Sequence, residues 1–399
     1  MTPLAGLDLP AFDTADTTLN GRPFHDVMEG LAANGWLARL PLGVLTLDRE
    51  AGEFFLRHRS ATFPGQLIAE LYGIESGPLR EEIDRNVLHL DGDVHARLRR
   101  LVNPSFTPRA ADRWRPVMRG YLEQLWSEVD GPTCDLVEAI AKPYPSLTIA
   151  AVMGAPESDA PSLHHWSNWI QKQFDGPSLL AERGLIEQAV TELYTWLEQL
   201  LASRRATPGD DLVSRLVRAE QDGDRLTDVE LVNLVLNVLI GGVDTTQAQL
   251  AHAVRLFAEH PDQWALLARE PELVPQAVEE VLRHEPITPF TARVLTCDVV
   301  FRDVHFPAGT VVMIGAFTGN RDGAGDPGFD ITADRGGARL LTFGAGIHYC
   351  LGVNLARAEL EEALGFLAPR MPGLRLTSPP QFGTVQDMYG LDRLDVAWS

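Results

Sequence analysis

The stretch Leu341-Thr342-Phe343-Gly344-Ala345-Gly346-Ile347-His348-Tyr349-Cys350-Leu351-Gly352 determines how the rest of the chain is interpreted. Its glycines permit tight turns or the close approach of a flat group, and it leads into a helix-like run from Val353 to Leu367. Because helix N-termini favour negative charge, a thiolate at Cys350 would be stabilised there. A thiolate on a glycine-rich loop suits a soft metal, and haem iron is one candidate. The alternative is a buried structural cysteine in a glycine-rich turn.

The composition is that of a folded, acidic chain. It has 399 residues, 45% of them hydrophobic, and a net charge of −21 from 34 basic and 55 acidic side chains. This hydrophobic fraction supports a substantial core and is too high for a disordered chain. The strong negative charge disfavours nonspecific binding to nucleic acid or to an anionic membrane. We therefore expect neither of these partners.

Cysteine use and apolar tracts indicate a cytoplasmic location. Cys134, Cys297 and Cys350 lie far apart without a CxxC pair, which argues against a disulfide framework and a zinc ribbon. The start from Met1 to Asn20 lacks a basic segment followed by an apolar core, so no signal peptide is expected. The longest apolar tract, Leu231 to Val243, is too short for a membrane span of about 20 residues. The basic residues are almost all arginine, which indicates a GC-rich bacterial coding sequence.

Hydrophobic periodicity predicts a mainly α chain with a small β-sheet region. The segment from Ser60 to Leu90 has no clear periodicity and is expected to be an irregular functional loop. The predicted helices are Phe24–Asn34, Arg49–Arg57, Val94–Asn103, Ala110–Glu128, Cys134–Met153, Ser162–Phe174, Ser178–Arg204, Thr227–Glu259, Pro271–His284 and Val353–Leu367, and the predicted strands are Trp36–Leu40, Val44–Leu47 and short runs within Phe290–Val312.

The predicted helix Thr227–Glu259 begins with a capping box and contains the run Gly241-Gly242-Val243-Asp244-Thr245-Thr246. Glycines inside a helix cost about 1 kcal/mol each relative to alanine, and helices kink or widen at such places. An acid and two hydroxyls follow directly in an apolar helix, as a buried proton relay requires. The alternative is a kink with a solvated Asp244 and hydroxyls bonded to the backbone.

Two further helices carry charges in helical register. Glu280 and Arg283 share one helix face, for which a solvated surface pair is the ordinary explanation. His95 and Arg99 also share a face, and that face could hold a buried anionic group. The other arginines of the run His-Ala-Arg-Leu-Arg-Arg point elsewhere and could meet an acidic protein. A solvated basic helix end is the alternative.

Together these motifs resemble the cytochrome P-450 superfamily in its soluble bacterial form. The cysteine loop fills every position of that family's haem signature with Phe343, Gly346, His348, Cys350 and Gly352. The motifs occur in the family's order over nearly the whole chain. The resemblance implies the mainly α P-450 fold in a single domain over residues 1–399. The haem would lie between the distal helix 227–259 and the cysteine loop 343–352.

The resemblance also assigns the charged motifs. Asp244 and Thr245, with the glycines before them, match the family's distal-helix motif. Glu280 and Arg283 match its glutamate–arginine pair, and with Arg335 they would form a structural triad, which replaces the surface-pair explanation. The implied haem-binding residues are His95, Arg99, Arg293 and His348 at the propionates, and Phe343, Gly344, Gly352, Ala356, Gly241 and Gly242 around the ring. The glycine-rich stretch from 323 to 328 is shorter than in the family.

The implied cofactor is haem b, held without covalent attachment because the chain has no CxxCH motif. Cys350 would be the axial thiolate of the iron. Thr245 would hold dioxygen or a water, and Asp244 would relay protons from solvent. The implied reaction inserts one oxygen atom of O2 into a small-to-medium lipophilic substrate by hydroxylation or epoxidation.

The electrons would come from a separate acidic ferredoxin or flavodoxin with its reductase, because the chain has no Rossmann fingerprint. Arg97, Arg100 and Arg109 could offer the carrier a basic docking site. We expect a cytoplasmic monomer in secondary metabolism or catabolism. The alternatives are a peroxygenase, a desaturase or oxidative coupling enzyme, and a haem-binding sensor or carrier without turnover.

The expected substrate pocket is mostly apolar, which suggests a lipophilic molecule with few polar groups. Many of its members could instead pack in the core. The candidates are Leu67, Leu71, Ile83, Val87, Leu88, Phe174, Asn237, Ile240, Pro289, Phe290, Thr291, Met388 and Tyr389.

Overall fold

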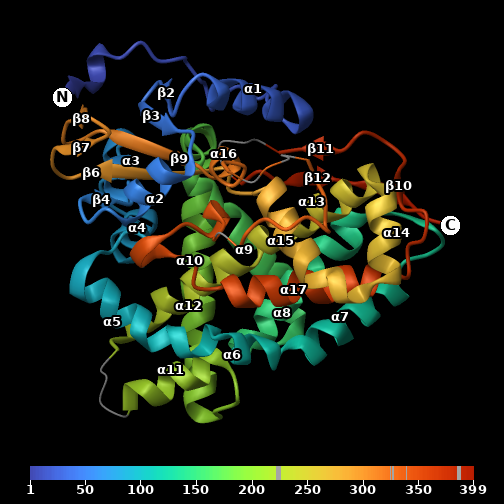
Figure 1. Cartoon of the computed structure of the whole chain (residues 1–399). Coiled ribbons are helices and arrows are strands. Elements are labelled where there is room, and N and C mark those ends of the chain that lie inside the picture. The colour runs from blue at the N-terminus through green and yellow to red at the C-terminus, as the bar shows by residue number, and fades with distance from the viewer. Residues whose placement is uncertain (222–225, 324, 326–327, 338, 384–387) are drawn as a thin grey trace. The chain divides into compact units, whose positions relative to one another are not determined.

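The computed structural model describes residues 1–221, 226–323, 325, 328–337, 339–383 and 388–399 (Figure 1). Residues 324, 326 and 327 of the short glycine-rich stretch therefore lie outside the described residues. The chain divides into two compact units, so the single domain over 1–399 stays a prediction. The first unit contains Met1–Pro64, Gln276–Cys350 and Phe382–Gly390, and the second contains Gly65–Pro275, Leu351–Gln381 and Leu391–Ser399.

The first unit is built on a five-stranded mixed sheet with the order β2-β3-β9-β6-β4. The strands predicted at Trp36–Leu40 and Val44–Leu47 are confirmed as β2 and β3, which pair antiparallel in a hairpin. β3 then pairs parallel with β9, and β6 pairs antiparallel with both β9 and β4. The strands are β2 Leu37–Leu40, β3 Gly43–Thr46, β4 Ala61–Thr62, β6 Phe290–Leu295 and β9 Val311–Gly315.

The hairpin turn depends on Gly43, which has a φ of 105°. A Cβ at this position would lie 2.0 Å from the carbonyl oxygen of Val311, so the parallel pairing with β9 excludes any larger residue. A second sheet has the order β1-β8-β7. The remaining elements around these sheets are β1 Thr2–Pro3, η1 Leu4–Gly6, α1 Gly21–Ala33, α2 Arg49–Arg57, α15 Val274–His284, β7 Val299–Phe301, β8 Val304–Phe306, α16 Ala316–Gly319, η7 Leu341–Phe343 and η8 Gly346–His348.

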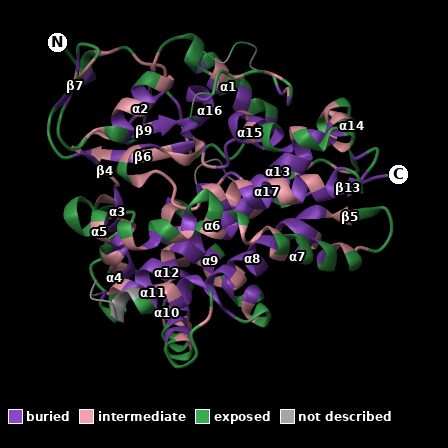
Figure 2. Ribbon diagram, turned by 60° about the horizontal axis from the view of Figure 1, so that its bottom comes forward, coloured by how far each residue is buried: buried purple, intermediate pink, exposed green. Residues whose placement is uncertain are grey.

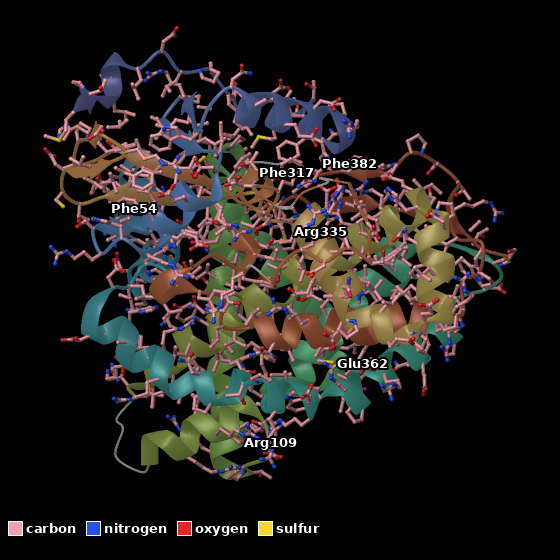
Figure 3. All side chains as sticks on the ribbon, in the orientation of Figure 1. Phe54, Arg109, Phe317, Arg335, Glu362 and Phe382 are labelled. Carbon is pink, nitrogen blue, oxygen red and sulfur yellow. The ribbon has the colours of Figure 1, made fainter. Side chains whose placement is uncertain are left out.

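Aromatic pairs tie the helices of the first unit to its sheets. Phe54 of α2 (labelled in Figure 3) stacks on Phe301 of β7 with ring centroids 4.4 Å apart. Phe24 of α1 meets Phe317 of α16 edge-on at 5.1 Å and Tyr389 at 5.6 Å. Such pairs add about 0.5–1.5 kcal/mol beyond the area they bury. They fix α1 and α2 to the first unit.

The second unit is mostly helical, and α8, α12 and α13 form its most buried part (Figure 2). α12 packs against α8, α9 and α10, and α13 packs against α8, α9 and α17. The elements are α3 Gly65–Leu71, α4 Pro78–Arg85, α5 Gly92–Val102, η2 Asn103–Phe106, α6 Pro108–Asp112, α7 Arg115–Ser127, β5 Thr133–Asp135, η3 Val137–Ala141, α8 Pro143–Met153, η4 Glu157–Asp159, α9 Ala160–Gln171, η5 Lys172–Phe174, α10 Gly176–Ala206, α11 Leu212–Gln221, α12 Asp228–Gly242, α13 Asp244–Glu259, α14 Pro261–Arg269, η6 Pro271–Leu273, α17 Val353–Leu367, β10 Arg375–Leu376, β12 Leu391–Arg393 and β13 Asp395–Ala397.

The predicted long helix is present as two helices, α12 and α13, which meet at Val243. Its capping box is confirmed: the Thr227 hydroxyl accepts from the N–H of Glu230, and the Glu230 carboxylate accepts from the N–H of Thr227. Among the described helices, the stretch 228–259 is long and apolar enough to cross a membrane, yet 67% of its apolar window is buried inside the protein. It is therefore packed as a core helix.

The irregular loop predicted over Ser60–Leu90 is wrong, since this segment contains β4, α3 and α4. Glycine and proline mark the starts of its short helices. Gly65 begins α3, and Gly77, with a φ of 97°, precedes Pro78 in the first turn of α4. Proline suits that position because the first turn does not use its N–H.

Two other predicted helices differ in detail. The range Cys134–Met153 begins in strand β5 and a π-helical turn, and α8 starts only at Pro143. Helix α10 departs from helical geometry at Glu182, whose φ is −124°.

Glu82 of α4 is the most deeply buried acid of the former loop region. It is 0% exposed, and its Oε1 accepts a hydrogen bond of 2.6 Å from the Asn86 amide. Burial raises the pKa of Glu82 to about 7, because hydrogen bonds from Asn86 and Gln173 offset the desolvation only in part. α4 also packs on α10 and α12, so this acid is enclosed by the second unit.

We expect Glu82→Gln to change how stability depends on pH. The folded state keeps a proton up to a pKa of about 7, whereas the ordinary value is 4.5. The stability from this proton is therefore complete below pH 4.5 and is lost as the pH rises through 7, in total about 3 kcal/mol. Urea unfolding across this range should show that the free energy of unfolding of the variant increases relative to that of the wild type as the pH rises. The exposed neighbour Glu81→Gln is the control, and parallel curves for Glu82→Gln and wild type would refute this prediction.

Glu280, Arg283 and Arg335 form a buried ion-pair network in the first unit (Figure 3 labels Arg335). Arg283 donates to both carboxylate oxygens of Glu280 at 2.7 Å, and Arg335 donates to them at 2.7 and 3.1 Å. Both arginines also donate to the carbonyl of Gly328 at 2.8 Å. Burial would raise the pKa of Glu280, but the hydrogen bonds from the arginines outweigh it and lower the pKa. The surface-pair explanation is wrong, because the Glu280 and Arg283 side chains are each 2% exposed.

Removing the carboxylate of this network should be strongly destabilising. In Glu280→Ala two arginines lose their counter-charge in a buried setting, which typically costs about 3–5 kcal/mol of unfolding free energy. The exposed pair Arg22–Asp26, with side chains 72% and 56% exposed, provides the matched control. Asp26→Ala should cost no more than about 0.5 kcal/mol. Equal urea midpoints for the two variants would show that the network does not stabilise the fold.

Candidate functional site

The cysteine loop runs from η7 through η8 and closes on itself at Cys350. The backbone N–H of Cys350 donates to the carbonyl of Phe343 at 3.0 Å, and the N–H of Gly344 donates to Leu341 at 2.8 Å. Cys350 and Phe343 are both half-buried. α17 begins three residues after the cysteine, at Val353, as the sequence predicts. The thiol is thus carried on a short, internally bonded turn.

The start of the loop is anchored by two side chains that sequence reasoning did not single out as functional. The Asn320 amide donates to the Thr342 hydroxyl at 2.8 Å, and its oxygen accepts from the N–H of Leu341 at 2.7 Å. The Thr342 hydroxyl in turn donates to the carbonyl of Leu282 in α15 at 2.8 Å. Asn320 begins the run Asn320-Arg321-Asp322, which resembles a further landmark of the P-450 superfamily and is the signal that could have identified it.

Two glycines of the loop have positive φ for different reasons. Gly346, with a φ of 73°, would place a Cβ 2.6 Å from the carbonyl oxygen of Leu56, so α2 leaves no room for a side chain. Gly344, with a φ of 66°, has open space on its Cβ side. Gly346 therefore allows close packing on α2, and Gly344 leaves one side of the loop uncovered.

In the second unit the two helix glycines also differ. A Cβ at Gly242 would lie 2.8 Å from Cδ1 of Ile149, so this glycine allows α12 to pack closely on α8. Gly241 is exposed and has open space on its Cβ side. The helical path breaks directly afterwards at Val243, whose φ and ψ are −92° and −75°. The pair thus combines one packed face with one open face.

Asp244 and Thr245 follow this break, and their side chains have different partners. The Thr245 hydroxyl donates to the carbonyl of Gly241 at 2.7 Å. The Asp244 carboxylate is 6% exposed and accepts a hydrogen bond from Ser167 of α9. Burial raises the pKa of Asp244, while Ser167 and His164 oppose that rise. Asp244 is therefore a buried acid that holds a proton more readily than a solvated aspartate, and the solvated-kink alternative is wrong for this residue.

The basic helix α5 presents its charges in two directions. His95 is buried and Arg99 is half-buried on one face of the helix. Arg97 forms an ion pair with Glu230 of α12, and its side chain is 33% exposed. Arg100 and Arg109 are exposed (Figure 3 labels Arg109).

The four predicted propionate partners belong to different units. His95 and Arg99 lie in the second unit, whereas Arg293 of β6 and His348 of η8 lie in the first. Arg293 is buried, and it donates to the carbonyl of Ala292 at 2.8 Å. His348 is half-buried. Their joint action on one ligand remains a prediction.

The predicted pocket residues also divide between the units. Leu67, Leu71, Ile83, Val87, Leu88, Phe174, Asn237 and Ile240 lie in the second unit, and Pro289, Phe290, Thr291, Met388 and Tyr389 lie in the first. Several pack in the core, as Ile83 does in a cluster of the second unit and Phe290 and Tyr389 do in a cluster of the first. Leu71 and Leu88 are exposed, at 54% and 37%.

A pocket of about 200 Å³ lies beside the cysteine loop within the first unit. α2 contributes Glu53 and Arg57, and the loop contributes Leu341, the backbone of residues 344–346 and Tyr349. The lining contains none of the residues predicted for the substrate pocket. This pocket is therefore a separate feature of the loop.

The residues present fit a haem. A haem brings four nitrogen ligands of its own and needs one soft axial ligand from the protein, which the half-buried Cys350 can supply. Across the described part of the chain, the Cβ positions of Gly344, Gly352 and Gly241 meet no neighbouring atom within 4 Å. Open backbone of this kind permits a flat ring to approach closely. Ala356, in the first turn of α17, is half-buried.

Comparison with known proteins agrees with this assignment. The family model described as cytochrome P-450 matches residues 75–324. The chain is 36% identical to the luteothin monooxygenase of Streptomyces thioluteus over 94% of this chain and 91% of the relative. It is 38% identical to the erythromycin C-12 hydroxylase of Saccharopolyspora erythraea over 81% and 80%.

The fold agrees as well. The crystal structure of CalO2 superposes with a TM-score of 0.91 at 29% identity, over 98% of this chain and 99% of that one. The mainly α fold with small sheets is thus confirmed as the P-450 fold. The chain belongs to the cytochrome P-450 family and is a haem-iron monooxygenase.

Proposed function

We propose that this monooxygenase hydroxylates or epoxidises a small-to-medium lipophilic natural product, with Cys350 as the axial ligand of a noncovalent haem b. The observation that carries the proposal is the half-buried thiol on a turn closed by its own N–H, at the cysteine position of a complete haem signature. The relatives support the substrate class, since their names refer to luteothin and erythromycin.

When bound, the haem supplies a thiolate-ligated iron that activates dioxygen. Cys350 provides the thiolate, and the turn between Phe343 and Cys350 fixes its position. His95, Arg99, Arg293 and His348 would hold the propionates by charge-assisted hydrogen bonds. Gly241 and Gly344 leave the backbone bare where a flat ring must approach, in keeping with their open Cβ sides.

On the distal side, Asp244 and Thr245 deliver protons. The raised pKa of Asp244 supports this role, because a general acid works best when its pKa approaches the working pH. The Thr245 hydroxyl donates to Gly241, so its oxygen remains able to accept a hydrogen bond from a water. A water held there passes a proton inward, and Asp244 replaces it from solvent.

The electrons come from a separate acidic ferredoxin or flavodoxin with its reductase, and the enzyme works as a cytoplasmic monomer. Exposed Arg100 and Arg109 support docking of an acidic carrier through rim charges, which mainly raise the association rate. Arg97, predicted for the same surface, is paired with Glu230 and would contribute less charge to it.

The ligand assignment predicts a thiolate spectrum. Reduced wild-type protein with carbon monoxide should show the red-shifted Soret band of thiolate ligation, and Cys350→Ser should lose it completely because a hydroxyl does not replace the thiolate. Cys134→Ser and Cys297→Ser are the matched controls and should keep the band. A normal Soret position in the wild type would overturn the assignment.

The relay assignment predicts uncoupling without loss of binding. Thr245→Ala should lower product formed per NAD(P)H by about tenfold or more and raise hydrogen peroxide, because proton delivery contributes at least that factor. Thr245→Ser keeps the hydroxyl and should remain close to wild type. The assay uses a substrate found by screening natural products for the low-to-high-spin shift. Unchanged coupling in Thr245→Ala would contradict the role given to this hydroxyl.

A further inference from the structure

The partners of Asp244 come from a different helix, α9. Ser167 of α9 donates its hydroxyl proton to Oδ2 of Asp244. His164, one turn earlier on the same helix, places Nε2 3.8 Å from Oδ1. Residues three apart share a helix face, so both side chains approach Asp244 from one side. Ser167 is fully buried, and its other acceptor, the carbonyl of Ile240, is farther away at 3.5 Å, so the contact with Asp244 is the closer one.

His164 is itself fixed by α13. Its Nε2 lies 2.9 Å from Oε1 of Gln247, which follows Asp244 by one helical turn. An amide oxygen only accepts hydrogen bonds, so Nε2 carries the proton and directs it toward α13. The His164 side chain is 16% exposed and that of Asp244 is 6% exposed. His164 therefore stands between solvent and the buried acid.

The orientation of the acid does not come from Thr245. Successive helix residues point about 100° apart, and the Thr245 hydroxyl is bound to Gly241 of its own helix. The carboxyl group of Asp244 is instead turned toward α9 by Ser167. The packing of α9 on α13 therefore decides where this carboxyl group lies.

We propose that Ser167 and His164 are positioning residues of the oxygenase reaction: they hold the carboxyl group of Asp244 at the solvent end of the proton path, on the α9 side of the helix. The proposal rests on the relay role given to Asp244 above. In each cycle Asp244 gives one proton to the water beside Thr245 and regains one from solvent. Neither Ser167 nor His164 changes its covalent state.

The contact can be tested without turnover. Urea unfolding of wild type, Ser167→Ala, Asp244→Ala and the double variant forms a double-mutant cycle. The loss of stability caused by Ser167→Ala should fall by at least half in the Asp244→Ala background, because the partner of the hydroxyl is then absent. Independent, additive effects would show that the two side chains do not hold each other, and the proposal would fail.

The positioning role is tested by proton delivery. Dioxygen consumption is followed in H2O and D2O with excess ferredoxin and ferredoxin reductase, so that electron supply is not limiting. Ser167→Ala should slow consumption at least threefold and increase the H2O/D2O rate ratio. Ser167→Thr, which keeps the hydroxyl, should restore the wild-type values. His164→Phe should behave like Ser167→Ala.

The matched controls are Ser162→Ala and His165→Phe, which alter exposed side chains of the same helix. If Asp244→Asn is slow but Ser167→Ala and His164→Phe match these controls, the relay role stands and the positioning proposal is overturned. If Asp244→Asn itself consumes dioxygen at the wild-type rate and isotope ratio, the relay role fails, and the positioning proposal falls with it.

Discussion

One carboxylate, that of Glu280, organises the part of the first unit that carries the cysteine loop. It binds two arginines and accepts the N–H of Asp330 at 3.0 Å, so helix α15 and the stretch that carries Asp330 and Arg335 meet at one charge. The carbonyl of Leu282 in the same helix, α15, accepts a hydrogen bond from the Thr342 hydroxyl, and Leu282 directly precedes Arg283 of the network. A buried charge is costly unless it is fully paired, and this one is. The loop is thereby tied to a buried ion-pair network of its unit.

In the second unit, the carboxyl group of Asp244 is held inside an otherwise apolar helical stretch. Gly242 brings α8 so close that water has no room on that face, whereas Gly241 leaves the other face open. The break at Val243 then allows Asp244 to start a new helix with its carboxyl group held by α9. Close packing, an opening and an acid thus occur within four consecutive residues.

The sequence predicted the parts of this molecule that have local signals. The capping box at Thr227 and the hairpin around Gly43 each depend on residues that are close in sequence, and both are present. The prediction of a loop over Ser60–Leu90 was wrong because the helices there are short, and proline and glycine at their starts cannot be told from loop residues. The role of Ser167 could not be predicted from the sequence, because it depends on a contact with Asp244, which belongs to another helix.

The close contact between Gly242 and Ile149 limits the order in which these two positions can change over evolutionary time. An alanine at position 242 would place its methyl group 2.8 Å from Cδ1 of Ile149, well inside normal contact distance. Valine at position 149 lacks that carbon, so once Ile149 has been replaced an alanine at position 242 needs no shift of that side-chain end. Valine first costs about 0.5–1.5 kcal/mol for the lost methyl group, whereas alanine first overpacks the core by about 1–3 kcal/mol. Sequences in this lineage should therefore vary at position 149 before they vary at 242, and the two positions should change as a correlated pair.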